Sequence, residues 1–330
     1  MEALKAEPAH RRLEVRAQED VGALRRDVAA LAAGSAVRPA DAALAVSELA
    51  TNLVLHTSAG GYVLYRRMAA GIELIAVDRG PGLPGVRRPG PRLGVGLGTV
   101  RRLSSTFDLY SSQPAGTVVL ARLSARLPCN RWCRWSAVNV PQGDGPASGD
   151  AWAVAGDGRL GALLVDGLGH GPEAALAAQA AVSAFGEGAA ADVEGFLHRA
   201  HEAMRTTRGG VLAVAVLDPV AGEVRYAGVG NIAARLLVGG RSSALGGRAG
   251  TLGTQLAAPH VHVQPCPWAP GATLIMASDG LRSAWDPSPY PGLLAHDPAV
   301  VAATLQRDFG RPGDDATVLV VQDVRPPEGG

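Results

Sequence analysis

The sequence has 330 residues, of which 47% are hydrophobic and 18% are charged, and its formal net charge is +1. This length accommodates two ordinary domains that each bury a core, and the composition is that of a globular chain rather than a disordered one. The arginines are spread along the chain, so we expect neither a nucleic-acid-binding track nor a membrane-binding face.

The sequence also gives expectations about location and redox state. No apolar run reaches the ~18 residues needed to span a bilayer, and residues 1–15 lack the apolar core of a signal peptide. Cys129 and Cys133 could begin a zinc site, but no second pair of ligands follows, and Cys266 completes no disulfide pattern. We therefore expect a cytoplasmic protein with reduced thiols.

The first part of the chain predicts helix, helix, hairpin, loop, helix and two strands. A helix from about Asp20 has a glycine stop near Gly34, and a second begins at Pro39 and runs to about His56. Further elements are predicted from periodicity and from glycine turns. They are strands over Tyr62–Arg67, Ile72–Val77 and Thr117–Leu123, and a helix that opens within Gly94–Thr99.

A composition break between about residues 125 and 134 separates this part from a strand-rich second part, so we expect domains over residues 1–126 and 134–330. Predicted helices cover Glu173–Phe185, Asp192–Thr206 and Pro298–Phe309. The predicted strands are Ala151–Ala155, Leu160–Val165, Val211–Leu217, Glu223–Ala227, Ala234–Val238, Val261–Gln264, Thr273–Ala277 and Thr317–Val321. Consecutive strands interrupted by a helix pair predict an α+β sandwich.

The segment SELATN carries the first chemical signal. Glu48 and Asn52 are four residues apart, so both project from one face of the second helix. A carboxylate beside a side-chain amide oxygen suits a magnesium-nucleotide site, in which the amide coordinates the metal and the carboxylate accepts a proton. A solvated helix face is the alternative for such a pair on its own.

Two glycine motifs follow SELATN in the chain. Asp78 ends an apolar strand and opens Asp78–Gly82, where an acceptor could bind the exocyclic amine of adenine. The second motif, Gly94–Thr99, opens a helix, where exposed backbone N–H groups favour phosphate. Each motif alone is compatible with a simple turn, whereas their order and spacing together indicate a nucleotide pocket.

Residues 10–125 therefore resemble the GHKL ATPase superfamily, and in particular small bacterial switch kinases and anti-sigma factors of the RsbT and RsbW type. The resemblance implies a Bergerat-type α/β sandwich that binds ATP and Mg²⁺. By motif, Glu48 matches the catalytic base, Asn52 the magnesium ligand and Asp78 the adenine contact. The lid and phosphate contacts would be Gly80, Gly82, Gly94, Gly96, Gly98 and Thr99, with Thr117 as the last nucleotide-box residue.

Acidic residues recur beside glycines at strand ends in the second part. Buried strands that end in Asp are costly unless the charges meet a cation, and converging carboxylates suit Mg²⁺ or Mn²⁺. A pair of such ions activates water for attack on phosphorus. Simple Asp-Gly turns are the alternative for any single case. The positions are Asp150, Asp166, Asp279, Asp314 and Asp315.

This pattern resembles the metal-dependent protein phosphatases of the SpoIIE type, and the run DGLGHG is similar to the RsbX branch. The resemblance implies a four-layer α-β-β-α sandwich over residues 134–323 with two Mn²⁺ or Mg²⁺ ions. Asp166 would be the catalytic bridging ligand, and Gly167 would supply a carbonyl ligand. The other metal ligands implied are Asp150, Asp279 and Asp314, with Asp315 as an adjacent candidate.

The chain departs from the phosphatase pattern at two positions. Ala151–Ala153 stands where relatives often carry a second acid, which predicts weak binding of one metal. Leu168 occupies the position of a proposed leaving-group histidine, and His170 lies two residues further on. We interpret His170 as a structural or solvent-facing loop residue rather than as a replacement acid.

Three functions are compatible with these motifs. The first is a bifunctional stress-signalling regulator whose kinase half phosphorylates a Ser or Thr of an anti-anti-sigma (STAS-type) partner and whose phosphatase half removes that phosphate. The second is a phosphatase whose ATP module only binds a sigma factor or a partner phosphatase. In the third, ATP controls the phosphatase allosterically. The ATP-binding family often dimerises, so a homodimer is also open.

Overall fold

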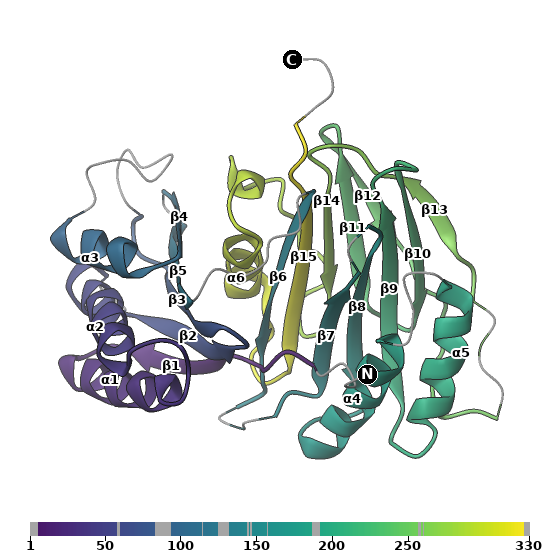
Figure 1. Cartoon of the computed structure of the whole chain (residues 1–330), viewed down its shortest axis with the longest axis horizontal. Helices are drawn as coiled ribbons and strands as arrows, with labels where there is room; N and C mark the ends of the chain where they lie inside the picture. Colours follow the sequence, from purple (N-terminus) through teal and green to yellow (C-terminus); the bar gives the residue numbers. More distant parts are fainter. Residues whose placement is uncertain are drawn as a thin grey trace. The chain divides into compact units, whose positions relative to one another are not determined.

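The structure is a computed structural model that describes residues 6–57, 60–82, 94–113, 115–124, 132–143, 145, 147–156, 158–186, 192–256, 259 and 261–326. The chain forms two compact units (Figure 1). The N-terminal unit contains His10–Pro128 together with Asp286–Arg307. The C-terminal unit contains Met1–Ala9, Cys129–Trp285 and Asp308–Gly330. The units therefore do not follow a single cut in the chain.

The N-terminal unit is built on a five-stranded antiparallel sheet in the order β1-β2-β3-β5-β4. Its strands are β1 (Arg11–Val15), β2 (Gly61–Met68), β3 (Gly71–Asp78), β4 (Thr106–Ser112) and β5 (Gly116–Ser124). Its helices are α1 (Gln18–Ala32), α2 (Pro39–His56) and α3 (Val95–Leu103), followed late in the chain by η1 (Leu293–Ala295) and by α6 (Pro298–Phe309) as far as Arg307.

One face of this sheet forms the apolar core with α1, α2 and α3. Ala45, Leu49 and Leu53 recur every four residues along α2, so they form a stripe that packs against the sheet. The other face is polar near its centre, because the strand register aligns Arg66, Glu73 and Arg122 across β2, β3 and β5. Asp297, which directly precedes α6, accepts hydrogen bonds from Arg122 on this second face.

The C-terminal unit contains two five-stranded sheets, in the orders β13-β10-β9-β8-β7 and β12-β11-β14-β15-β6. The first sheet comprises β7 (Asp150–Ala155), β8 (Leu160–Gly167), β9 (Gly210–Asp218), β10 (Glu223–Val229) and β13 (Gln264–Pro267). The second comprises β6 (Cys133–Val140), β11 (Ala233–Val238), β12 (Arg241–Leu245), β14 (Thr273–Ala277) and β15 (Ala316–Asp323).

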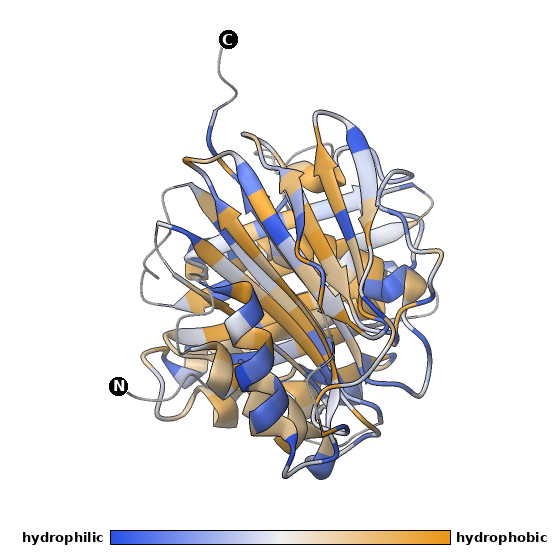
Figure 2. Ribbon diagram, turned by 90° about the vertical axis from the view of Figure 1, so that its right-hand side faces the viewer, coloured by the Kyte–Doolittle hydropathy of each residue, from blue (hydrophilic) through white to orange (hydrophobic). Residues whose placement is uncertain are grey.

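Alternation along the strands gives this unit two cores. Trp152 and Leu164 face Leu274 and Leu319 between the sheets. The neighbouring side chains on the first sheet point the other way and pack against α4 (Pro172–Phe185) and α5 (Val193–Met204). Strands of the two sheets accordingly carry long hydrophobic stretches, shown in orange in Figure 2.

The prediction of a mixed α+β fold is confirmed. The predicted bounds of α2 and α6 agree with the structure, and the strand predicted over Val261–Gln264 begins instead at Gln264 as β13. The sequence interpretation missed β1, β6 and β12. The predicted second domain, residues 134–330, includes α6, and the contacts of Asp286–Arg307 group that stretch with the N-terminal unit. None of the helices in the described ranges is long and apolar enough to cross a bilayer.

Candidate functional site

The acidic residues of the C-terminal unit come from loops at the ends of neighbouring strands. Asp150 begins β7, and the strand register places it directly opposite Asp166 near the end of β8. Asp279 follows β14, and Asp314 precedes β15, which pairs with β14. The expected carboxylates therefore come from two pairs of adjacent strands.

Asp166 is the electrostatic centre of this group. Burial, followed by the negative charge of Asp279 and a side-chain hydrogen bond to it, raises the pKa of Asp166 to about 7, and Asp314 adds to the effect. Burial and then Asp279 also raise the pKa of Asp314. Negative charges that raise the pKa of a neighbouring carboxyl group repel its ionised form, and a divalent cation relieves that repulsion. We call Asp166, Asp279 and Asp314 the acidic cluster.

Asp150 lies deeper than the acidic cluster and is held by neighbouring side chains. Its Oδ2 accepts a hydrogen bond from Ser278 Oγ at 2.6 Å, and Ser278 Oγ in turn accepts one from the Thr317 backbone N–H at 3.0 Å. Burial, then the charge of Asp166, raises the pKa of Asp150 well above its usual value. Ser278 precedes Asp279 directly, so this network fixes the loop that carries Asp279.

Asp315 has a structural position. Its Oδ1 accepts from the Gln142 backbone N–H at 2.7 Å and its Oδ2 from the Gly149 backbone N–H at 2.9 Å. Both carboxylate oxygens are therefore used to hold backbone, and Asp314 is the better candidate ligand of the two. A Cβ at Gly280 would lie 1.9 Å from the Asp315 carbonyl oxygen, so these two loops meet only because residue 280 is glycine.

Gly167, the expected carbonyl ligand, is the last residue of β8 and packs closely against Gly149 and α4. Its N–H donates to the Gly149 carbonyl at 3.0 Å, and a Cβ would lie 2.2 Å from the Ala174 carbonyl oxygen of α4. His170 and Leu168 are exposed in the loop that follows. The exposure of His170 agrees with a solvent-facing loop residue.

Two residues near the acidic cluster were not predicted. The Asn231 side-chain amide donates to Asp279 Oδ2 at 2.8 Å and therefore orients that carboxylate. Arg208 forms an ion pair with Glu173, and its Nη1 lies 3.0 Å from where a Cβ on Gly169 would be. The positively charged guanidinium of Arg208 therefore lies beside the loop that follows Asp166. The sequence signal available for Asn231 was its position after Gly230 at the end of a strand. Arg208 had no such signal.

The donor set fits a hard divalent cation, because it consists of carboxylate and carbonyl oxygens. Within the residues described, no group of three or more His, Cys, Asp and Glu side chains is already arranged to hold a metal ion. Asp150 is turned toward Ser278 and Asp279 toward Asn231. The raised pKa values of Asp166 and Asp314 support a cation site, and the complete ligand set stays a prediction.

The N-terminal unit brings Asp78 and Thr117 together at the end of its central strands. Asp78 Oδ1 accepts from the Gly80 N–H at 2.7 Å and from the Thr117 N–H at 3.2 Å. Burial raises the pKa of Asp78, and these hydrogen bonds oppose the rise. Gly116 has φ +91°, and a Cβ there would lie 2.2 Å from the Asp78 carbonyl oxygen, so the close approach requires glycine.

Glu48 and Asn52 lie on α2 beside the start of α3. A Cβ on Gly96 would lie 2.5 Å from Glu48 Oε2, so the glycine leaves room for that carboxylate. The side-chain nitrogen of Asn52 is buried and has no hydrogen-bond partner among the residues that the structure describes. A buried amide left without a partner fits a polar ligand at this position.

The remaining nucleotide candidates surround α3. Gly94 is its exposed N-cap, with no side-chain cap, and the Gly98 N–H donates to the Gly94 carbonyl at 2.9 Å. Thr99 Oγ1 donates to the Val95 carbonyl at 3.1 Å. Gly82, with φ +75°, ends the described part of the loop. The lid predicted between Gly82 and Gly94 lies outside the described residues.

The C-terminal unit is a two-sheet α+β sandwich with acidic residues gathered at the ends of its strands. This arrangement is the one expected for a metal-dependent phosphatase. The model of the Stage II sporulation protein E (SpoIIE) family matches residues 156–323. The chain belongs to this family.

Solved structures agree with this fold. One, described as "The bacterial stressosome: a modular system that has been adapted to control secondary messenger signaling", is 26% identical with a TM-score of 0.53 and covers 57% of this chain and 98% of its own. RsbX in complex with magnesium is 20% identical, with a TM-score of 0.51, and covers 60% of this chain and 98% of its own. The RsbU and RsbW domains of Rv1364c from Mycobacterium tuberculosis are 22% identical, with a TM-score of 0.50 and coverages of 61% and 62%.

A relative also matches by sequence alone. The serine/threonine-protein kinase RsbT of Bacillus subtilis (strain 168) is 36% identical over 87 residues, which span 23% of this chain and 65% of the kinase. The chain therefore spans slightly less than two thirds of the kinase that it matches.

Proposed function

We propose that the C-terminal unit is a Mn²⁺- or Mg²⁺-dependent phosphoserine and phosphothreonine phosphatase of a partner-switching pathway. The observation that carries this proposal is the acidic cluster, in which burial and Asp279 raise the pKa of Asp166 to about 7. Membership of the SpoIIE family and the fold shared with RsbX support it.

The residues of the acidic cluster, with the Gly167 carbonyl and Asp150, would hold two cations. When bound, such ions lower the pKa of a coordinated water and so supply the nucleophile for attack on phosphorus. Asn231 orients Asp279, and Asp315 holds the loops on both sides of the cluster. Arg208 offers a positive charge for the substrate phosphate beside Gly169.

Hydrolysis of a phosphothreonine peptide across a Mn²⁺ titration tests this half of the proposal. We expect turnover that requires the cation and stops with EDTA. Metal-independent turnover would overturn the phosphatase assignment.

We further propose that the N-terminal unit has the GHKL fold, binds Mg-ATP and phosphorylates a Ser or Thr of a STAS-domain anti-anti-sigma partner. The resemblance to RsbT and the placement of Asp78 beside Thr117 support a nucleotide pocket. Glu48 would accept the proton of the attacking hydroxyl, and Asn52 would hold Mg²⁺. Both activities would then act in one cytoplasmic pathway, from domains within about residues 1–126 and 134–330.

A binding module without turnover is the second candidate for the N-terminal unit. It would sequester a sigma factor or a partner phosphatase, alone or as a homodimer. The engagement of the Thr99 hydroxyl within α3 favours it, because that group donates to Val95 and accepts from Arg102 at 2.8 Å.

Transfer of radiolabelled phosphate from ATP to a purified STAS partner separates the two candidates. Transfer that disappears in Glu48→Ala, with nucleotide still bound, supports the kinase. Nucleotide binding without transfer to any STAS partner would favour the binding module, and loss of nucleotide binding in Asp78→Asn would support the placement of the pocket in either case.

A further inference from the structure

One stretch of chain groups by its contacts with the N-terminal unit although it lies within residues 156–323, which the SpoIIE family model matches. Asp286–Arg307 is grouped by its contacts with residues 10–128. In the sequence it stands between Asp279 and Asp314, two members of the acidic cluster. We call Asp286–Arg307 the inserted segment.

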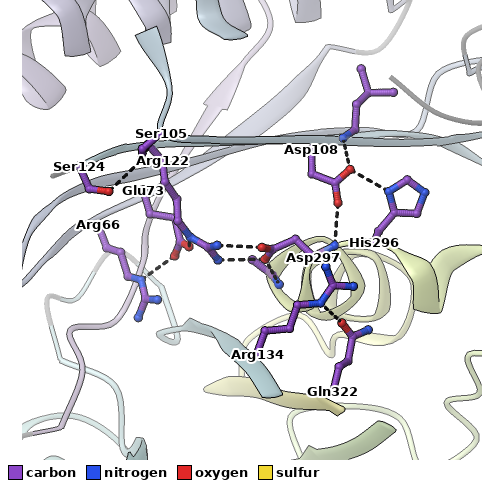
Figure 3. Close-up of polar contacts among 12 residues, drawn as sticks. Arg66, Glu73, Ser105, Asp108, Arg122, Ser124, Arg134, His296, Asp297 and Gln322 are labelled. Atoms are coloured by element: carbon purple, nitrogen blue, oxygen red, sulfur yellow. Dashed lines mark hydrogen bonds and ion pairs between the residues drawn. The ribbon is translucent and has the colours of Figure 1, made fainter. Parts of the chain in front are cut away.

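The N-terminal end of α6, in the middle of the inserted segment, is fixed to the sheet by charged groups (Figure 3). Arg122 donates from Nη1 and Nη2 to Oδ2 and Oδ1 of Asp297 at 2.9 and 3.0 Å. Asp108 accepts from the Asp297 backbone N–H at 2.6 Å, and its Oδ1 lies 2.9 Å from His296 Nδ1. A bidentate pair and a second carboxylate therefore hold this end to β4 and β5.

The C-terminal end of the inserted segment is bonded to the candidate adenine-binding loop. Arg307 Nη1 donates to the Asp78 carbonyl oxygen at 3.2 Å, and the Arg79 guanidinium donates back to the Arg307 carbonyl oxygen. One residue earlier, Gln306 Oε1 accepts from the Tyr62 hydroxyl at 3.2 Å. The peptide that carries the Asp78 carboxylate is thus held to α6 by hydrogen bonds in both directions.

Within the C-terminal unit, the chain on either side of the inserted segment leads directly to the acidic cluster. The Arg282 N–H donates to the Phe309 carbonyl at 2.9 Å, and the Arg311 N–H donates to the Gly280 carbonyl at 2.7 Å. Gly280 follows Asp279, and its close approach to Asp315 leaves no room for a Cβ. These two stretches are therefore pinned together beside the loops that carry Asp279 and Asp314.

We propose that the inserted segment couples the two sites, with Arg307 as a positioning residue: nucleotide bound beside Asp78 changes the rate at which the acidic cluster hydrolyses phosphoprotein. The proposal rests on the functions proposed above for both units. A nucleotide that contacts Asp78 acts on the peptide that holds Arg307, and the loops of Asp279 and Asp314 are the continuations of the same segment. Such coupling is reciprocal between the two binding equilibria.

The test uses the full chain and a non-hydrolysable ATP analogue. Hydrolysis of a phosphothreonine peptide is measured at saturating free Mn²⁺, with and without the analogue, and analogue affinity is measured by fluorescence. We expect the analogue to change kcat or KM by about fivefold or more, as for ordinary allosteric coupling. An analogue that binds but leaves both parameters unchanged would overturn the coupling and leave the two sites standing.

Variants in the inserted segment sharpen the test. Asp297→Asn weakens the pair with Arg122, touches neither site, and should keep the basal rate while reducing the nucleotide effect to about twofold or less. Arg307→Gln should reduce the effect in the same way, and Arg307→Lys should restore part of it. Glu14→Gln, at an exposed ion pair with Arg12 in the same unit, should change nothing.

Failures of the underlying functions are distinguishable from failure of the coupling. A wild-type chain without metal-dependent turnover contradicts the phosphatase, and one that does not bind the analogue contradicts the nucleotide pocket; either outcome also overturns the coupling. Thermal melts of each variant identify any that do not fold. If Arg307→Gln is one of these, Asp297→Asn decides, and a full nucleotide effect in a folded Asp297→Asn contradicts the proposal.

Discussion

Glu73, a buried carboxylate of the N-terminal unit, and the acidic cluster of the C-terminal unit differ in the charges that surround them. Glu73 in the N-terminal unit accepts from Arg66 and Arg122, each at 2.7 Å, and its Oε1 lies 3.1 Å from His10 Nε2. Burial would raise the pKa of Glu73, but the charges of Arg66 and Arg122 outweigh it and hold that pKa well below its usual value. In the acidic cluster, by contrast, burial and then the neighbouring carboxylates raise the pKa of Asp166.

The contrast separates a structural site from a candidate functional one. A buried acid that the protein pairs with its own cations needs no ligand, and removal of one partner leaves an uncompensated buried charge. An acid whose pKa is raised by burial and by neighbouring carboxylates, with no cation of the protein's own beside it, is poised to bind a cation from solution. Burial alone does not distinguish the two cases, whereas the sign of the pKa change does.

The largest expected effect is that of Asp166→Asn on phosphatase activity. The change removes the carboxylate at the centre of the acidic cluster, so it should lower metal-dependent kcat/KM by more than about 100-fold, beyond the loss usual for residues that only orient a metal ligand. Steady-state hydrolysis across a Mn²⁺ titration measures it. Glu202→Gln, an exposed carboxylate on α5, is the control and should retain wild-type activity.

A change at Glu73, by contrast, should lower the stability of the fold. Glu73→Gln removes the buried negative charge that Arg66 and Arg122 share, so the free energy of unfolding should fall by about 3–5 kcal/mol. Urea denaturation followed by circular dichroism measures the loss. Glu14→Gln, at an exposed pair, should stay within about 1 kcal/mol of wild type. Equal stability of the two variants would remove the contrast between Glu73 and the acidic cluster.

A smaller effect is expected at the residue that orients Asp279. Asn231→Ala removes the 2.8 Å hydrogen bond to Asp279 Oδ2 and should weaken metal affinity by about 10–100-fold. The diagnostic result is a higher Mn²⁺ concentration at half-maximal rate with the maximal rate largely recovered at high Mn²⁺. An unchanged Mn²⁺ requirement would mean that Asn231 has no part in the site.

The smallest effect concerns pH in the absence of metal. Folding raises the pKa of Asp166 from 3.8 to about 7. Protonation of Asp166 therefore stabilises the folded state, and this contribution is fully present below the unfolded-state pKa. It is lost as the pH rises toward 7 and above. Thermal melts in EDTA should give a lower Tm at pH 8 than at pH 5.5. Saturating Mn²⁺ should reduce or reverse that slope, and a metal-free Tm that rises over this range would contradict the account.

The strands that the sequence did not predict share a physical property. β1 and the strands β6 and β12 are all at sheet edges, where one side of the strand has no partner. β1 reads RRLEV and β12 reads RSSAL, so neither has the apolar run that marks central strands. The central strands β8, β9 and β15 are buried on both faces and were predicted.

The candidate site divides in a similar way. The acids at Asp166, Asp279 and Asp314 were predictable because each lies next to a strand with an apolar pattern. The orienting role of Asn231 and the use of Asp315 to hold backbone were not, because both depend on which loops meet. The grouping of residues 286–307 with the N-terminal unit has the same origin: it is established by contacts between residues far apart in the sequence, such as Arg122 and Asp297.

Calorimetric titration of the metal-free full chain with Mn²⁺ at pH 7 tests the central claim most directly. If the acidic cluster is a metal centre, Mn²⁺ binds with release of protons, because Asp166, with its pKa raised to about 7, is partly protonated before binding. Titrations in buffers of different ionisation enthalpy measure that release, and Asp166→Asn should abolish both binding and release at this site. Absence of Mn²⁺ binding by the wild-type chain, or unchanged binding in Asp166→Asn, would contradict the account.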